Sequence, residues 1–339
     1  MYFNIEYQIK INLKMREKRI YYLVSLMFLL IVFGCGNREK ATKEEEKQVN
    51  EFKILSSYFA ENNFINKPKS EGGAPAIILA SQLYQALESN ILVIDIRRIA
   101  DYEKGHIPGA VHKKMEELPG YFENEISAPD FEKVIIACYS GQSSGYSASL
   151  LQLMGYHNVY SLKWGYSSWH PDFARATWLA NVSDKYAGQL ETTYHQPEKK
   201  YDFPQIQTGK SNGYDIAKAR AKALFEKGFK PVKVNVDEIM ENPGNYHIMN
   251  YWPKELYENG HLPGAFHYPP KKSFSVDQLL NTLPKDKLVV TYCFAGQTSA
   301  FITAYLKMLG YDARSLVFGA NSFMHEVMKE NGWNAFTMK

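Results

Sequence analysis

The chain repeats itself at a fixed offset of 155 residues, and this repeat sets its domain organisation. Residues 102–110 read Tyr-Glu-Lys-Gly-His-Ile-Pro-Gly-Ala and align with residues 257–265, Tyr-Glu-Asn-Gly-His-Leu-Pro-Gly-Ala. The same offset aligns residues 138–144, Cys-Tyr-Ser-Gly-Gln-Ser-Ser, with residues 293–299, Cys-Phe-Ala-Gly-Gln-Thr-Ser. A chain of 339 residues is long enough for two domains, each with its own core. We therefore expect two copies of one domain.

Short apolar runs alternate with longer helical patterns inside each copy. In the first copy, residues 91–96 and 134–137 are typical of buried strands, and residues 144–154 are typical of a helix that Gly155 ends. Alternation of strands and helices predicts an α/β domain, because parallel strands need helical crossovers. Each copy should form a mostly parallel sheet with helices on both faces.

The repeat also gives the expected domain limits. We place the first domain at residues 75–180 and the second at residues 228–339. Residues 181–227 then form a linker, with a helix expected over residues 215–227.

A cysteine stands at the same point in both copies, after an apolar strand and before a glycine-containing turn into a helix. Open α/β sheets place ligand sites at the carboxyl ends of their parallel strands. Backbone N–H groups at a helix N-terminus favour an anion, and a glycine lets the chain curl so that these groups point inward. One such cysteine is more often an ordinary buried residue, but Cys138 and Cys293 share one register. The pattern therefore predicts a site that stabilises a thiolate and a persulfide anion built on it.

These segments resemble the rhodanese homology domain of sulfurtransferases, and the resemblance covers both domains. In the first copy it rests on residues 95–97, 102–110, 138–144, 160–166 and Trp169. It implies that the loop cysteine takes a sulfane sulfur from a donor such as thiosulfate and passes it to an acceptor. The acceptor is a thiol, including that of a small redox protein, or cyanide. No metal and no organic cofactor are implied.

The resemblance makes Cys138 and Cys293 the catalytic candidates. The other loop residues are the candidates for binding the sulfur donor: Tyr139, Ser140, Gly141, Gln142, Ser143 and Ser144 in the first copy and Phe294, Ala295, Gly296, Gln297, Thr298 and Ser299 in the second. His106 and His261 are expected to have structural roles, because a thiolate held by a helix end needs no general base.

The second copy departs from the pattern where the first has Asp95 and Arg97, a structural ion pair by resemblance. It has Asn250 and Trp252 at these positions. Because that pair is lost while the cysteine loop is intact, we rank Cys138 above Cys293 as the sulfur carrier.

The cysteine loops are also consistent with two classes of function other than sulfur transfer. A cysteine-dependent phosphatase needs a guanidinium to hold the phosphoryl oxygens, and no Arg or Lys occurs in residues 138–149 or 293–305. The phosphatase class is therefore disfavoured. A non-catalytic module that binds a partner or a sulfur-bearing protein stays open as the alternative, especially for the second domain.

The N-terminal sequence predicts export. Residues 16–19, Arg-Glu-Lys-Arg, precede an apolar run over residues 20–33, which is the order of a secretory signal. This run of about 14 residues is shorter than the ~20 that cross a bilayer as a helix. It ends in Phe33-Gly34-Cys35, which resembles the lipobox of bacterial lipoproteins, although Phe33 replaces the usual small residue.

We therefore expect a signal peptide over residues 1–34, with Met15 as a candidate true start, and a lipidated Cys35 followed by a tether to residue 74. The lipid would hold the exported protein on a membrane. That membrane is the outer membrane, on its periplasmic face, in a host with two membranes, and the cell membrane, on its outer face, in a host with one. A short N-terminal anchor with an incidental cysteine is the alternative.

Charge and cysteine content exclude two further classes. The net charge of +3 comes from the first 34 residues, and the remaining chain has 34 basic and 34 acidic residues. Without a basic stretch, nucleic acid is not an expected partner. Three cysteines are too few for a disulfide framework.

Overall fold

The computed structural model describes residues 50–64 and 76–338. The expected signal peptide, the lipidation site Cys35 and most of the expected tether lie outside the described residues. Among the helices of the described part, none combines the length and apolar character that a membrane crossing requires.

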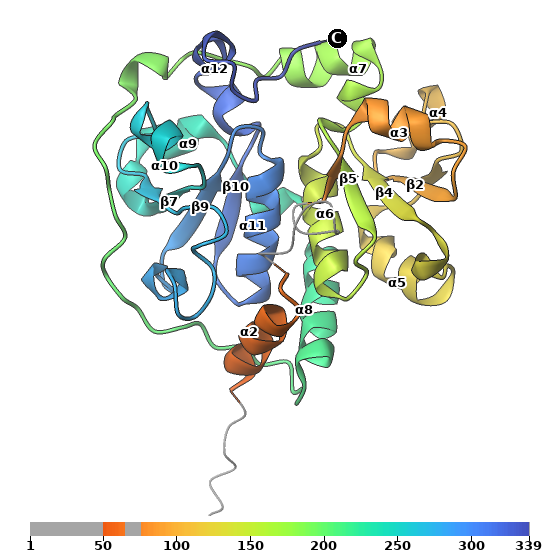
Figure 1. The fold of residues 1–339 in the computed structure, drawn as a ribbon, viewed down its shortest axis with the longest axis horizontal. Coiled ribbons are helices and arrows are strands. Elements are labelled where there is room, and N and C mark those ends of the chain that lie inside the picture. Colours follow the sequence, from red (N-terminus) through yellow and green to blue (C-terminus); the bar gives the residue numbers. More distant parts are fainter. Residues whose placement is uncertain (1–49, 65–75, 339) are drawn as a thin grey trace, which may run out of the picture. The chain divides into compact units, whose positions relative to one another are not determined.

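The first copy forms a five-stranded parallel sheet with strand order β1-β5-β4-β2-β3 (Figure 1). Its strands are β1 (Ile77–Ile78), β2 (Ile91–Asp95), β3 (Val111–His112), β4 (Lys133–Ala137) and β5 (Val159–Leu162). Its helices are α3 (Ala80–Ala86), α4 (Ile99–Lys104), α5 (Leu118–Asn124), α6 (Gln142–Leu153) and α7 (Pro171–Ala174).

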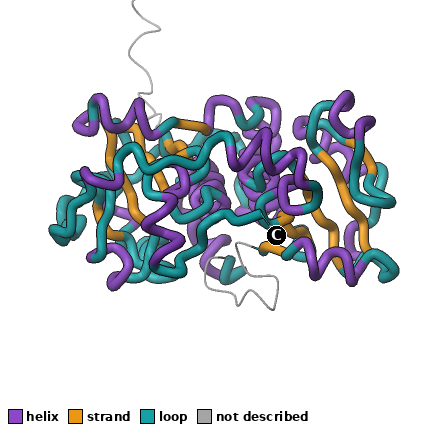
Figure 2. Tube along the Cα trace, turned by 90° about the horizontal axis from the view of Figure 1, so that it is seen from above, coloured by secondary structure: helices purple, strands orange, loops and turns teal. Residues whose placement is uncertain are grey.

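The second copy forms a second parallel sheet with the equivalent order, β6-β10-β9-β7-β8. Its strands are β6 (Lys233–Val234), β7 (Tyr246–Asn250), β8 (Phe266–His267), β9 (Leu288–Tyr292) and β10 (Ala313–Leu316). Its helices are α9 (Val236–Glu241), α10 (Lys254–Glu258), α11 (Gln297–Met308) and α12 (His325–Glu330). In Figure 2 the strands of the two sheets form two separate groups with helices between them.

The central strands are apolar because both of their faces are covered. In β4, Val134 and Ile136 pack into one core cluster, whereas Ile135 and Ala137 pack into another. Side chains that alternate along a strand point to opposite faces of the sheet, so each face has its own core. This confirms the predicted α/β fold with helices on both faces of two parallel sheets.

Three helices join the two copies: the helix that follows each cysteine loop and the linker helix. Helices α6 and α11 pack against each other, and α8 (Gly213–Lys227) contacts both of them. The side chain of Asn212 accepts a hydrogen bond from the Asp215 N–H and caps α8. The predicted helix over residues 215–227 is therefore confirmed, and it starts two residues earlier than expected.

Part of the expected tether is folded, which corrects the prediction for residues 35–74. Helix α2 (Glu51–Glu61) lies in this segment and packs on α8. It buries Phe52, Leu55 and Phe59 in the core that both copies share. The buried apolar residues of this helix follow one another at helical spacing, and the charged run over residues 43–47 lies outside it.

Candidate active site

Cys138 lies where the sequence places it, between β4 and α6. Its Sγ accepts hydrogen bonds from the backbone N–H groups of Gly141, at 3.1 Å, and Ser144, at 3.3 Å. Gly141 has a φ of 92°, a left-handed conformation that favours glycine, and α6 begins at the next residue. The loop therefore surrounds the sulfur with N–H donors, an arrangement that stabilises a negative charge there.

Cys293 occupies the equivalent position between β9 and α11. Its Sγ accepts a hydrogen bond from the Ser299 N–H at 3.3 Å and lies 3.7 Å from the Ser299 hydroxyl. Gly296 is left-handed with a φ of 79°, like its counterpart in the first loop. Cys293 is 5% exposed and Cys138 is 1% exposed.

A glycine supports each loop from behind. A Cβ added to Gly165 would lie 2.4 Å from the Cys138 carbonyl oxygen, and one added to Gly319 would lie 2.3 Å from the Cys293 carbonyl oxygen. Both glycines also have positive φ. Glycine is thus required at positions 165 and 319, because the chain passes directly against the cysteine loop there.

The first loop is further fixed by polar contacts at its edge. The Tyr139 hydroxyl donates to the Asp101 carboxylate at 2.5 Å and accepts from Arg98. Hydrogen bonds from Tyr139 and then Arg98 lower the pKa of Asp101 far below its usual range. The Ser140 carbonyl accepts from the indole N–H of buried Trp178 at 3.2 Å. Tyr139 and Ser140 are therefore both hydrogen-bonded to residues outside the loop.

Gln142 and Gln297, both expected to bind substrate, reach across to the opposite copy, and Gln297 also lines a pocket at Cys293. The Gln142 amide accepts from the Phe318 N–H at 2.8 Å and donates to the Leu316 carbonyl at 3.1 Å. Gln142 is 2% exposed, so its polar atoms serve the contact between the copies. Its role in substrate binding stays a prediction.

Gln297 makes the matching contacts in the other direction. Its amide accepts from the Trp164 N–H at 3.0 Å and donates to the Leu162 carbonyl at 3.0 Å. A Cβ added to Gly141 would lie 2.5 Å from the Gln297 side chain, and one added to Gly296 would lie 2.2 Å from the Gln142 side chain. Each loop glycine therefore also leaves room for the glutamine of the other copy.

These glutamines connect the two cysteine sites through hydroxyl groups. In the first copy, the Ser144 hydroxyl lies 3.3 Å from Cys138 Sγ and 2.8 Å from the Ser161 hydroxyl. The Ser161 hydroxyl in turn accepts from Gln297 at 3.1 Å. A polar chain thus runs from Cys138 to the helix that follows Cys293.

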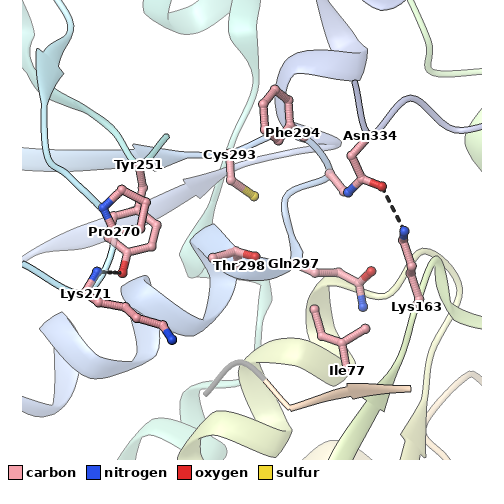
Figure 3. Close-up of a pocket in the computed structure, with 11 residues that line it drawn as sticks. Ile77, Lys163, Tyr251, Pro270, Lys271, Cys293, Phe294, Gln297, Thr298 and Asn334 are labelled. Carbon is pink, nitrogen blue, oxygen red and sulfur yellow. Dashed lines mark hydrogen bonds between the residues drawn. The ribbon is translucent and has the colours of Figure 1, made fainter. Parts of the chain in front are cut away.

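A pocket of about 280 Å³ opens at Cys293. Figure 3 shows the Cys293 sulfur pointing into its middle, between Tyr251 and Lys271 on one side and Asn334 and Lys163 on the other. Its walls come from both copies and from the C-terminal segment. The lining residues are Ile77, Lys163, Tyr251, Pro270, Lys271, Cys293, Phe294, Ala295, Gln297, Thr298 and Asn334.

Two lysines give the pocket positive charge. Lys163 follows β5 and donates to the Asn334 side chain at 2.8 Å. The backbone N–H of Lys271 donates to the Tyr251 hydroxyl at 2.8 Å, and Lys271 has a φ of 64°, which is uncommon for a residue with a side chain. Burial raises the pKa of Tyr251 to about 12, so its hydroxyl keeps its proton and can donate.

The departure of the second copy from the ion-pair pattern shapes this pocket. In the first copy, Asp95 and Arg97 form the predicted ion pair, with a 2.7 Å contact between buried side chains. In the second copy, the indole of Trp252 stacks on Phe294 with ring centroids 4.5 Å apart. Phe294 lines the pocket, so an aromatic stack replaces the ion pair and supports the pocket wall.

The structure places the remaining predicted residues around the two sulfurs. Ser143 and Thr298 are half-buried at the starts of α6 and α11, and Thr298 and Ala295 line the pocket. Sequence reasoning missed Lys163, Tyr251 and Lys271, because they lie in three separate loops, and Lys163 joins the other two only through the packing of the two copies. The repeat gave no signal for them.

Comparison with known proteins places the fold in a family. The model of the rhodanese-like domain matches residues 79–172 and 235–326, which is over half of the chain. The chain is 38% identical over 101 residues to the thiosulfate sulfurtransferase GlpE of Pseudomonas fluorescens, covering 29% of this chain and 84% of that protein. It is 35% identical over 92 residues to GlpE of Shewanella oneidensis, covering 26% and 87%.

Solved structures also match at low identity. SseA from Escherichia coli, described as a 3-mercaptopyruvate sulfotransferase with the rhodanese fold, is 17% identical, with 71% of this chain and 97% of that chain covered and a TM-score of 0.28. A thiosulfate sulfurtransferase from Pseudomonas aeruginosa is 17% identical, with coverages of 79% and 46% and a TM-score of 0.28. On the extent of the domain match, this chain belongs to the rhodanese-like family and carries two copies of its domain.

Proposed function

We propose that this protein is a sulfurtransferase that carries a sulfane sulfur as a persulfide on a loop cysteine, with Cys293 as the main carrier and Cys138 as the second candidate. The observation that carries the proposal is the pocket at Cys293, a thiol at a helix N-terminus, because two lysines are among the residues that line this pocket. The relatives named thiosulfate sulfurtransferase support the same chemistry.

The pocket fits a small anionic sulfur donor such as thiosulfate. Lys163, Lys271 and the Tyr251 hydroxyl supply positive charge and a hydrogen-bond donor around the sulfur. The N–H groups at the start of α11 stabilise the negative charge that the persulfide retains after transfer.

The reaction proceeds in two displacements. In the first, the Cys293 thiolate attacks the outer sulfur of thiosulfate, the new S–S bond forms, and sulfite leaves with the electron pair of the broken bond. In the second, an acceptor thiolate or cyanide attacks the terminal sulfur and the Cys293 thiolate leaves. The products are a new persulfide or thiocyanate, and the free enzyme is restored. The kinetics are therefore ping-pong.

The proposal reverses the ranking of the two cysteines made from the sequence. Cys138 has two backbone N–H donors on its sulfur, but it is 1% exposed and Trp178 packs on its loop at Ser140. The pocket of about 280 Å³ described above opens at Cys293. In the second copy the stack of Trp252 on Phe294 takes the place of the ion pair.

Thiocyanate formation from thiosulfate and cyanide tests the proposal in wild type, Cys138→Ser, Cys293→Ser and the double variant. We expect activity to survive in Cys138→Ser and to be lost in the other two, because a hydroxyl cannot carry a sulfane sulfur. Activity in the double variant, or activity lost only in Cys138→Ser, contradicts the assignment. Failure of the wild type with thiosulfate, mercaptopyruvate and polysulfide would favour the binding-module alternative.

The charge of the pocket has its own test within the same assay. Lys271→Met should raise the KM for thiosulfate several-fold, with a smaller effect on kcat, because the lysine binds the anion before the reaction and not only in the transition state. Lys272→Met is the matched control, since its exposed side chain lies next along the chain and outside the pocket.

We further propose that the protein is exported and anchored through a lipid on Cys35. The support is the sequence order of residues 16–35, which lie outside the described part of the structure. Membrane fractionation with mass analysis of the mature N-terminus tests this. Cys35→Ser should leave the membrane fraction or stay unprocessed, whereas a wild-type chain that retains residues 20–34 would show the proposal to be wrong.

A further inference from the structure

Three potential metal ligands meet where the linker crosses the second copy. They are Glu191, His195 and His261, and their ligand atoms all lie within 4.8 Å of one another. His195 Nε2 is 2.8 Å from Glu191 Oε1, and His261 Nε2 is 3.4 Å from the same oxygen. They have no part in the chemistry proposed for the cysteines.

His261 presents a lone pair to this cluster. Its Nδ1 lies 2.7 Å from the Tyr257 carbonyl oxygen, which can only accept, so Nδ1 carries the proton. In the neutral ring Nε2 is then unprotonated. The His261 side chain is fully buried, and its Nε2 makes no hydrogen bond, even to Glu191 at 3.4 Å.

The backbone of the linker holds the other two ligands in place. Glu191 and His261 exchange two backbone hydrogen bonds of 3.0 Å each, as an isolated antiparallel bridge. The His195 N–H donates to the Tyr257 hydroxyl at 3.1 Å, and its carbonyl accepts from the His267 N–H at 3.0 Å. Glu191 and His195 thus lie on a linker segment that backbone hydrogen bonds fix against the second copy, and in Figure 1 this green segment runs along the outer side of that copy.

We propose that Glu191, His195 and His261 bind one zinc ion, which fastens the linker to the second rhodanese-like domain. Two imidazole nitrogens and one carboxylate oxygen are a donor set that zinc prefers, with a fourth position left for water. The Nδ1 hydrogen bond of His261 to a backbone carbonyl is the second-sphere contact that orients a metal-bound histidine. The resemblance in the sequence had implied no metal.

The distances between the ligand atoms suit such an ion with small adjustments. Bonds of about 2.0–2.1 Å in a tetrahedron place the ligand atoms roughly 3.4 Å apart. His261 and Glu191 already have this separation. The 2.8 Å contact between His195 and Glu191 is a hydrogen bond that zinc replaces, as the His195 proton moves to Nδ1. The Gly264 N–H also donates to Glu191 Oε1, at 2.6 Å, and orients the carboxylate.

The first copy provides a natural control. His106 occupies the same turn as His261, and its Nδ1 lies 2.9 Å from the Tyr102 carbonyl. Its ring also stacks on the tyrosine, at 4.0 Å, as His261 does on Tyr257 at 3.6 Å. His106 is exposed, however, and is not part of the ligand cluster. The turn alone therefore does not make the site.

Equilibrium dialysis of the full-length chain against zinc chloride, followed by metal analysis, tests the proposal. The chain carries Cys35→Ser, Cys138→Ser and Cys293→Ser so that no thiolate binds the metal. We expect one zinc per chain in this background and a rise in Tm when zinc is added, because the ion binds the folded state.

His195→Asn and Glu191→Gln should weaken zinc binding at least ~10-fold and remove the Tm rise, while His106→Asn should leave both unchanged. Both changed ligands are partly exposed, so circular dichroism should show an unaltered fold. Binding of less than one equivalent in the background, or unchanged affinity in His195→Asn, overturns the proposal.

Discussion

At the scale of single residues, the glycine behind each cysteine loop leaves no room for a side chain. Gly319→Ala places a methyl group 2.3 Å from the Cys293 carbonyl oxygen in a backbone of positive φ. We predict a loss of unfolding free energy of about 2–4 kcal/mol, of which the left-handed backbone contributes about 1 kcal/mol and the clash the rest.

Gly332→Ala is the matched control, since Gly332 has a similar φ of 64° and open space around its Cβ position. Urea unfolding of both variants separates the clash from the backbone cost. Equal losses would mean that the chain behind Cys293 adjusts freely, and the supporting role of Gly319 would then be refuted.

A buried histidine gives the second copy a pH dependence. Burial, with a smaller effect of Lys287, lowers the pKa of His247 to about 4 from 6.5. The folded state then binds the proton less readily than the unfolded state, so this contribution to stability is complete above pH 6.5 and is lost as the pH falls towards 4. From the shift, the loss is on the order of 3 kcal/mol.

Urea unfolding at pH values from 7 to 4 measures this effect in wild type and in His247→Gln. Burial also lowers the pKa of His261, His267 and His325, and these act in the same direction, so the difference between the two proteins isolates His247. We expect that difference to shrink as the pH falls. Parallel curves would rule out the contribution of His247.

At the scale of the elements, α6 and α11 are held together by the reciprocal glutamines at their first positions. Gln297→Ala removes three hydrogen bonds to the first copy and leaves the Trp164 N–H and the Leu162 carbonyl without a buried partner. We predict a loss of about 2 kcal/mol in unfolding free energy.

The measurement is urea unfolding with exposed Gln205→Ala as the control, which should change stability by less than about 0.5 kcal/mol. Gln142→Ala should resemble Gln297→Ala, because its contacts mirror those of Gln297. A neutral Gln297→Ala would show that helix packing alone holds the two copies.

The elements of each copy follow closely from the sequence because their patterns are local. Apolar runs predict β2 and β4, and the linker helix α8 starts within two residues of its expected position. The roles of Gln142 and Gln297 cannot be predicted in this way, because a glutamine in a repeated loop is as consistent with substrate binding as with contact to a partner domain. Only the packing of the copies shows that their amides cross over.

At the scale of the whole molecule, two copies of one domain have acquired different surroundings. The first keeps the buried pair of Asp95 and Arg97, and its cysteine lies deeper. The second has Asn250 and Trp252 in place of the pair. The pocket at its cysteine is lined in part by Lys163 of the first copy. The site at Cys293 is therefore a property of the tandem arrangement, and neither copy would form it alone.

Intact-mass spectrometry with peptide mapping, after a single addition of thiosulfate and removal of the excess, tests this account most directly. It reads the persulfide itself, before any acceptor is needed. We predict the added mass of one sulfur atom on Cys293, retained in Cys138→Ser and absent in Cys293→Ser. A sulfur found on Cys138 while Cys293 stays unmodified would contradict the account.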